Sequence, residues 1–210
     1  MSDRTRELVE RIRQLEEELQ QALAERSQGL DFDLERLRVR FSDEVVAAQR
    51  RIRTGLGAYL RGARLGVIVT APVIYGVFPA LVLLDISVTL YQWICFPVYG
   101  IARVRRADHV VIDRHRLPYL NAIERLNCAY CGYANGVLAY ATEIASRTEQ
   151  FWCPIKHARR LAQPHRRYPL FLDYGDGEAY RRELETMREG IRQEEASRPG
   201  ARPTGGQRDG

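Results

Sequence analysis

The pattern of apolar and polar positions divides the chain around one long apolar segment. From Leu65 to Ala102, Asp85 is the only formally charged side chain in thirty-eight residues. An α-helix rises about 1.5 Å per residue and the hydrocarbon core of a bilayer is about 30 Å thick, so roughly 20 apolar residues make one crossing. The segment is nearly twice that long. It predicts a membrane hairpin over residues 65–102, with passes over 65–84 and 86–102 and a turn near Asp85.

Basic residues on both flanks predict the orientation of this hairpin. Positive charge next to a membrane segment favours the cytoplasmic side. The flanking arginines are Arg50, Arg51, Arg53, Arg61 and Arg64 before the segment and Arg103, Arg105, Arg106, Arg114 and Arg116 after it. Both termini are therefore expected in the cytoplasm, against a bilayer whose anionic headgroups attract arginine.

Two alternatives to a two-pass hairpin stay open. The stretch from Val82 to Val88 contains no Gly or Pro to make a turn, and an aspartate within hydrocarbon is costly unless it reaches water or a partner. A re-entrant hairpin would satisfy the same pattern, as would the buried core of a soluble protein. The remaining segments are too polar to enclose so many apolar residues, which favours the membrane.

Residues 1–64 predict a charged helical stem. Apolar residues there recur at spacings of four and three, which is typical of a short coiled coil: Leu8, Ile12, Leu15, Leu19 and Ala22. This pattern predicts either a homo-oligomer or one amphipathic helix packed on its own chain. Residues 31–41 leave helix and strand unresolved. Val45 to Leu60 has one apolar face, as expected of an amphipathic helix next to a membrane.

Residues 103–195 predict a small cysteine-bearing domain. Its clearest motifs are Cys128-Ala-Tyr-Cys131-Gly132 and Cys153-Pro-Ile-Lys-His157. Two cysteines separated by two residues and followed by Gly suit a tight metal-binding knuckle. Pro154 suits the first turn of a helix, which would place Cys153 and His157 on one side. We therefore predict a structural zinc site with Cys128, Cys131, Cys153 and His157 as ligands, in a helical zinc-knuckle domain.

The same cysteines allow other ligand sets and other chemistry. His165 and His115 are alternative fourth ligands. Cys128 and Cys131 have the spacing of a thiol redox pair, and iron could replace zinc, although Lys156 occupies the place of a fourth cysteine in a rubredoxin-type loop. Four protein ligands leave no open coordination position, so a hydrolytic zinc enzyme is not expected.

The net charge of +5 and the pI near 9.2 allow nucleic acid as a partner. Tyr130, Tyr133 and Trp152 could stack on bases beside Arg159 and Arg160. The simpler interpretation is that the aromatics cover a metal site and the arginines end a helix, so nucleic-acid binding is not expected. A final helix is predicted by the apolar face of Tyr180, Leu184, Met187 and Ile191. Residues 196–210 are expected to be a disordered tail.

Several motifs together resemble a family of uncharacterised bacterial membrane-associated proteins. They are Ala71-Pro-Val-Ile-Tyr75, Cys95-Phe-Pro-Val-Tyr-Gly100, Asp113-Arg-His115, Leu126-Asn-Cys-Ala-Tyr-Cys131 and Glu149-Gln-Phe-Trp-Cys-Pro-Ile-Lys-His157. The resemblance covers residues 30–195. It implies a setting at the bacterial inner membrane and implies no activity.

These features predict a mainly α protein with a helical stem, a membrane hairpin and a cytoplasmic zinc domain. The expected function is a non-enzymatic membrane scaffold or assembly adaptor whose protein partners the sequence does not identify. The first alternative is a membrane-bound thiol or iron redox protein that uses Cys128 and Cys131. The second is a nucleic-acid-binding zinc module at the membrane.

Overall fold

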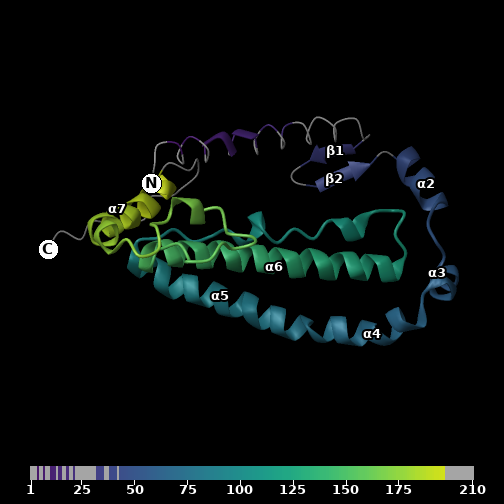
Figure 1. The fold of residues 1–210 in the computed structure, drawn as a ribbon. Coiled ribbons are helices and arrows are strands. Elements are labelled where there is room, and N and C mark those ends of the chain that lie inside the picture. Colours follow the sequence, from purple (N-terminus) through teal and green to yellow (C-terminus); the bar gives the residue numbers. More distant parts are fainter. Residues whose placement is uncertain are drawn as a thin grey trace. The chain divides into compact units, whose positions relative to one another are not determined.

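The computed structural model describes residues 4, 7, 10–12, 14, 15, 18, 21, 32–35, 38–41 and 43–196 (Figure 1). The described chain is mainly helical, as predicted. It forms two compact units, Met1–Phe78 with Val111–Asn135 and Pro79–Val110 with Gly136–Gly210. The predicted coiled coil falls largely outside the described residues, and so does the tail. Ile12 and Leu15 of the predicted seam are described, and both are exposed.

The first unit begins with a short antiparallel hairpin of β1 (Phe32–Glu35) and β2 (Arg38–Phe41), in which Phe32 is opposite Phe41. The ambiguous alternation of residues 31–41 is therefore a strand pattern. Three helices follow: α2 (Asp43–Arg51), α3 (Leu56–Gly62) and α4 (Leu65–Gly76). The apolar face expected from Val45 to Leu60 is thus divided between α2 and α3. A 3-10 turn, η2 (Arg114–Arg116), and the first half of α6 (Ala122–Trp152) complete the unit.

Aromatic side chains join α4 to the first half of α6. The Tyr130 hydroxyl donates to the Ile74 carbonyl at 2.8 Å, and the Tyr75 hydroxyl donates to the Asn127 side chain. The rings of Tyr75 and Tyr130 meet edge to face at 5.4 Å between centroids. Tyr130, one of the residues considered for base stacking, therefore packs within its own unit.

The turn predicted near Asp85 is wrong, because α5 (Phe78–Tyr99) continues through that residue. Nothing from Val82 to Val88 interrupts a helix, and the Asp85 carboxylate is paired with Arg106 at 2.6 Å. The helical interruption lies at Val77 instead. Pro79 has no N–H to donate to the Tyr75 carbonyl, and the Val77 N–H bonds the Ile74 carbonyl in a tighter turn at 3.2 Å.

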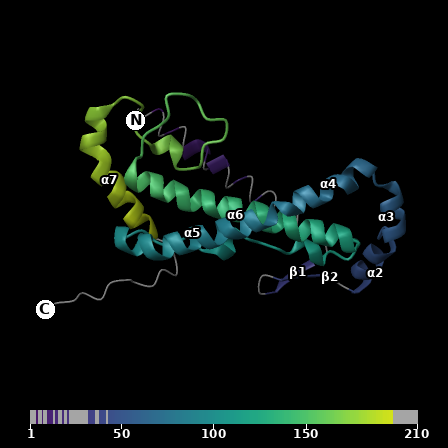
Figure 2. The same cartoon turned by 90° about the horizontal axis from the view of Figure 1, so that it is seen from below.

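The second unit is built on two parallel helices, α5 and residues 136–152 of α6, which run side by side in both ribbon views (Figures 1 and 2). The helices are parallel because later residues of α5 contact later residues of α6. Thr89 contacts Tyr140, and Tyr99 contacts Trp152. Two 3-10 turns, η1 (Arg106–Asp108) and η3 (Tyr168–Leu170), and the last helix α7 (Gly177–Ala196) complete the unit. The predicted final helix is confirmed, and Ile191 on its apolar face is buried.

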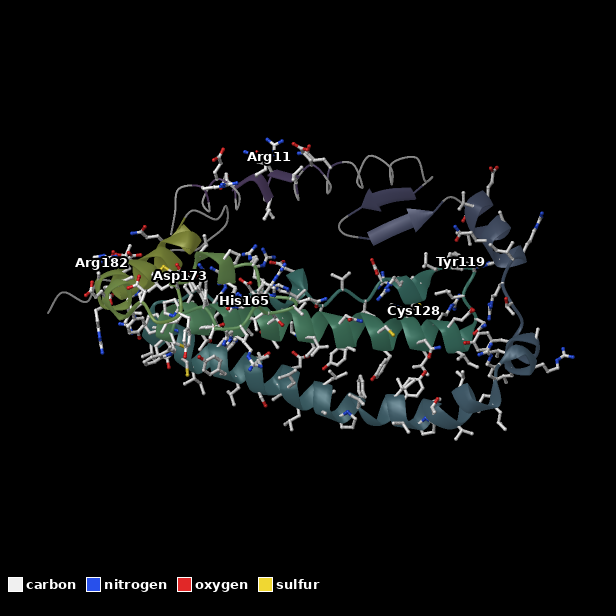
Figure 3. All side chains as sticks on the ribbon, viewed as in Figure 1. Arg11, Tyr119, Cys128, His165, Asp173 and Arg182 are labelled. Carbon is white, nitrogen blue, oxygen red and sulfur yellow. The ribbon has the colours of Figure 1, made fainter. Side chains whose placement is uncertain are left out.

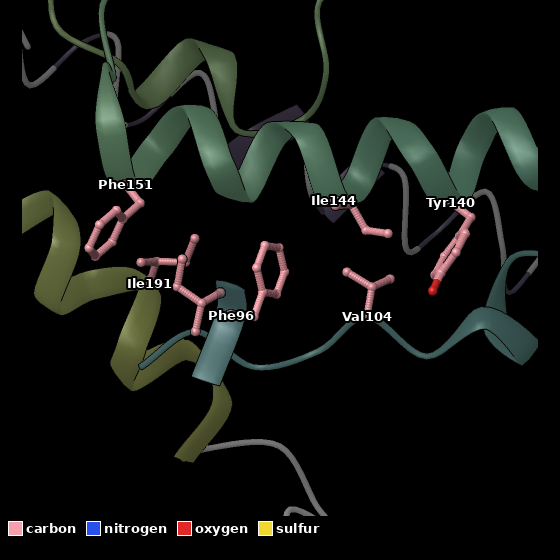
Figure 4. Close-up of a cluster of buried hydrophobic side chains, with 7 residues drawn as sticks. Phe96, Val104, Tyr140, Ile144, Phe151 and Ile191 are labelled. Atoms are coloured by element: carbon pink, nitrogen blue, oxygen red, sulfur yellow. The ribbon is translucent and has the colours of Figure 1, made fainter. Parts of the chain in front are cut away.

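The core of this unit combines side chains from segments that lie far apart in the sequence (Figure 4). Its buried members are Phe96, Ile101, Val104, Tyr140, Ile144, Phe151 and Ile191. They come from α5, the segment after it, α6 and α7. The core therefore forms only when segments far apart in the sequence have come together.

Residues 101–110, which we call the return segment, run back along α5. The Gln92 amide accepts from the Val104 N–H at 2.8 Å and donates to the Val104 carbonyl at 3.3 Å, so one side chain pairs both polar backbone groups. The return segment then reaches α6 at Gly136. A Cβ there would lie 2.7 Å from the Val110 Cα, so only glycine permits this approach.

The helix α6 passes through the expected knuckle. The Asn121 side chain accepts from the N–H groups of Ile123 and Glu124, both at 3.0 Å, and Glu124 accepts from the Asn121 N–H at 2.8 Å. This reciprocal cap starts the helix. From there α6 is continuous to Trp152, so the knuckle at Cys128 to Gly132 is not confirmed.

Candidate functional site

The most exposed apolar surface belongs to the helical stretch Leu65–Tyr99. Among the described residues it is the one helix that is long and apolar enough to cross a membrane by length and composition. It has 35 residues and a mean hydropathy of 2.3, and 6% of its most apolar window is buried. A core helix of a soluble protein would be mostly covered, so the exposure favours association with a membrane.

Within the second unit, α5 has two different faces. One face is buried and includes Leu81, Asp85, Gln92 and Phe96, spaced by about one or two turns. The opposite face is apolar and exposed, with relative exposures from 58% at Leu90 to 79% at Val98. We call it the apolar face of α5: Leu83, Ile86, Leu90, Trp93, Ile94 and Val98.

The polar groups of α5 are satisfied inside the unit. Asp85 accepts from the Arg106 guanidinium through both carboxylate oxygens, at 2.6 and 3.0 Å. The Gln92 amide also contacts the Tyr140 hydroxyl. Tyr91 and Thr148 pair through their hydroxyls at 3.0 Å. The helix therefore keeps most of its polar side chains toward the protein, and Ser87 is the exposed polar residue among the apolar ones on the other side.

Arginines line one border of the apolar face. The Arg103 guanidinium lies 5.0 Å from the centroid of the Trp93 ring, which is a cation–π distance. Two residues on, the Arg105 side chain is 77% exposed. A tryptophan and arginines beside an apolar face are typical of the lipid–water interface.

The predicted metal ligands fall into two pairs that belong to different units. Cys128, which is labelled in Figure 3, lies on α6 and is half-buried. Cys131 lies three residues further along the same helix and is exposed. Cys153 is exposed just beyond the end of that helix, and His157 lies in the segment after it.

The helix expected to begin at Pro154 is wrong. Residues 153–157 form no helix, and Ile155 forms a parallel bridge with Leu172. The Leu172 N–H donates to the Pro154 carbonyl at 2.8 Å, and the Lys156 N–H donates to the Leu172 carbonyl at 2.7 Å. This pairing with a distant segment outweighs the local preference of proline for a helix start.

Within the described residues, no group of three or more His, Cys, Asp or Glu side chains converges as metal ligands would. His157 stacks on Tyr168 at 6.0 Å between ring centroids. The alternative ligand His165 bonds Glu149 at 2.9 Å, and Lys156 bonds Asp173 at 2.8 Å, which holds the pKa of that carboxyl below its usual range. The four-ligand zinc site stays a prediction.

A buried ionic network in the second unit was not expected from the sequence. The Glu143 carboxylate accepts from Arg147 at 2.9 Å and from Arg167 at 3.0 Å. All three side chains are at most 11% exposed. The Arg147 guanidinium also donates to the Ala102 carbonyl at 2.7 Å, and Arg167 donates to Gln150 at 3.1 Å. The network joins α6 to the return segment and to the loop before η3, which is a structural role.

The Cys153 thiol opens onto a groove of about 390 Å³ beside α5 and α6. Val88, Tyr91, Ile144 and Trp152 make its walls largely apolar, and Glu149 adds one carboxylate. The groove can accommodate a small apolar group next to an accessible thiol.

Thiol labelling of the native full-length protein tests the zinc prediction. If the thiols share no metal, the exposure of Cys131 and Cys153 and the half-burial of Cys128 predict that maleimide modifies Cys131 and Cys153 at least about tenfold faster than Cys128, with or without a chelator. Mass spectrometry of the labelled peptides measures the rates. Protection of all three thiols that a chelator lifts would instead establish a shared metal site.

Comparison with known proteins finds no protein-family model, curated protein or solved structure that matches this chain.

Proposed function

We propose that this protein is a membrane-bound, non-enzymatic scaffold or assembly adaptor. The observation that carries the proposal is the apolar face of α5, six large side chains that are each more than half exposed. Removing a Leu, Ile or Val side chain fully from water is worth about 1.5–3 kcal/mol. Even half of that per residue amounts to several kcal/mol over the whole face, enough to hold a protein at a membrane.

The polar remainder of the chain would then present surfaces for other proteins. The N-terminal stem is proposed to pair with a second copy, and the cysteine-bearing segment is proposed to bind its partners from the cytoplasmic side of a bacterial inner membrane. A structural zinc ion held by Cys128, Cys131, Cys153 and His157 belongs to this proposal as its metal component. The charged flanks of the apolar stretch support the cytoplasmic orientation.

The alternative function is thiol or iron redox chemistry. It rests on Cys128 and Cys131, which stand one helical turn apart with one thiol exposed. Metal analysis of the purified protein separates the two functions. Stoichiometric zinc that resists mild reductant supports the scaffold, whereas iron or a readily cycling disulfide supports redox chemistry.

Fractionation of bacterial cells that produce the full chain tests the membrane proposal. We expect the protein in the membrane pellet, where high salt leaves it and detergent releases it. Replacing Leu90 and Ile94 with glutamate should move at least half of it to the aqueous fraction, because two side chains of the apolar face would become charged. Immunoblotting of the fractions measures the distribution.

Leu138→Glu is the matched control for this experiment. Leu138 on α6 is 50% exposed and Leu90 on α5 is 58% exposed, so the two leucines differ mainly in the surface to which they belong. The control variant should stay in the pellet. Wild-type protein in the aqueous fraction without detergent would contradict the proposed function.

A further inference from the structure

We infer that α5 lies in the plane of the membrane, with its apolar face against the acyl chains and its arginine border at anionic headgroups. This inference rests on the proposed membrane function and specifies how the surface binds lipid. Length and composition alone allow the same helix to cross the bilayer. The return segment, which packs beside the helix in the second unit, decides between an in-plane helix and a crossing helix.

The return segment places charges beside the middle of α5. Arg106 is bonded to Asp85, seven positions after the first residue of the helix, and Arg103 lies against Trp93 near its other end. Arg105 and Asp108 are also largely exposed, with side-chain exposures of 77% and 50%. A helix that crossed the bilayer would carry these charges into hydrocarbon, where exposed charged side chains are costly.

The backbone of the return segment is equally unsuited to hydrocarbon. Only helices and closed barrels satisfy all their own N–H and C=O groups, and lipid-exposed irregular backbone does not occur at membrane depth. Residues 101–105 have no regular secondary structure, and Arg103 and Arg105 in this stretch are exposed. In this stretch, the Gln92 side chain pairs only the backbone N–H and carbonyl of Val104. The side of α5 that carries the return segment therefore has to stay near water.

The opposite side of α5 suits an interfacial position along its whole length. From Leu83 to Val98 its exposed side chains are apolar except for Ser87, and no charged residue interrupts them. An in-plane helix buries such a face about 5–10 Å below the headgroups. All of these side chains then reach a similar depth, and the charged return segment remains in the headgroup layer or in water.

The border of the face favours lipid over a second protein chain as the occupant. Trp93 is 64% exposed and carries Arg103 on its ring, and Arg105 lies two residues on. Tryptophan prefers the headgroup level, and each basic residue near an anionic leaflet strengthens binding about fivefold. The apolar centre and cationic edge together match an anionic bilayer surface.

Depth measurement on single labelled sites tests the inference. Leu83→Cys, Leu90→Cys and Val98→Cys lie on the same face, and each is placed in a full-length chain whose four native cysteines are replaced by alanine. Each variant receives a nitroxide label and is bound to vesicles of equal parts phosphatidylcholine and phosphatidylglycerol. Relative accessibility to oxygen and to a water-soluble nickel chelate reports the depth.

We expect the three labels within about 5 Å of one depth, since the helix axis would be parallel to the surface. A crossing helix would spread them over roughly 22 Å along the bilayer normal, so Leu90 would lie about 10 Å deeper than the two outer labels. That spread, while the protein still binds vesicles, overturns the inference and leaves the proposed function intact. Failure of the wild-type chain to bind vesicles overturns both. Labels that are shielded without vesicles, in a protein that sediments as a dimer, would assign the face to a second copy and overturn the inference.

Charge variants give an independent readout. Replacing Arg103 and Arg105 with glutamine should weaken binding to vesicles that contain phosphatidylglycerol by roughly 25-fold and leave binding to pure phosphatidylcholine nearly unchanged. Replacing the exposed Arg181 and Arg182 on α7 in the same way is the control and should change neither. Equal losses from both pairs, or no loss from the first, would overturn the assignment of the arginine border to anionic headgroups.

Discussion

Replacing Gly136 with alanine is expected to destabilise the second unit by about 3 kcal/mol, the upper end of the usual cost of overpacking. The added Cβ would lie 2.7 Å from the Val110 Cα and 2.9 Å from the His109 carbonyl oxygen. These are backbone atoms, so no side-chain rotation relieves the clash, and the return segment has to leave α6. Urea unfolding of the purified protein, followed by circular dichroism, measures the change in the free energy of unfolding.

Two other glycines calibrate this expectation. A Cβ at Gly190 in α7 would have nothing within 4 Å, so alanine there should stabilise the protein by about 1 kcal/mol through helix propensity. Gly132 is intermediate, because its Cβ would lie 3.1 Å from the Val111 carbonyl oxygen. The expected order of cost is Gly136, then Gly132, then Gly190. Equal effects at Gly136 and Gly190 would mean that the return segment does not approach α6 in solution.

Replacing Glu143 with glutamine is expected to cost about 3–5 kcal/mol. The carboxylate is the common partner of Arg147 and Arg167, whose side chains are 7% and 6% exposed. Glutamine keeps the shape but removes the negative charge that Glu143 places between the two buried guanidinium groups. The midpoint and slope of the urea transition measure the loss. Glu183→Gln is the control, since Glu183 pairs with Arg182 at the surface and should change the free energy of unfolding by less than about 0.5 kcal/mol.

The same residue predicts how stability depends on pH. Burial alone would raise the pKa of Glu143, but the charge of Arg167 and hydrogen bonds from Arg147 and Arg167 outweigh it and hold the pKa below its usual range. Its contribution is therefore present above the unfolded pKa of about 4.3 and is lost as the pH falls through the lower folded pKa. Stability should drop below about pH 4 in the wild type and be flatter there in Glu143→Gln. Identical acid profiles for the two proteins would contradict the network.

Amphipathic periodicity was sufficient to predict α7, because its apolar residues Tyr180, Leu184, Met187 and Ile191 are all at least partly buried and their period is visible locally. The long apolar stretch was likewise visible. The turn at Asp85 was misplaced because a charged residue in an apolar run suggests a need for water, whereas here Arg106 supplies the partner from 21 residues away. Local sequence does not reveal such a partner.

The cysteine motif shows a different limit of sequence reasoning. A separation of three residues brings two thiols together on a helix as well as in a knuckle, so the spacing of Cys128 and Cys131 did not distinguish the two. Gly132 suggested a bend, yet its role is to admit the backbone of Val111. One visible signal was missed, the Asn121 and Glu124 pair that caps α6. Glu143 and Arg147 were also readable as a helical pair, whereas Arg167 joins them only through the tertiary fold.

The parallel arrangement of α5 and α6 also bears on how the chain is made. Thr89 and Tyr91 contact partners 51 and 57 residues further along, so a ribosome that adds about 5–20 residues per second delivers α6 roughly 3 to 11 s after α5. For part of that interval, Asp85 does not yet have its partner Arg106, and Gln92 does not yet have its partner Tyr140. The nascent chain therefore exposes the inner face of α5 until its second half has been translated, and wrong associations are most favoured during that interval.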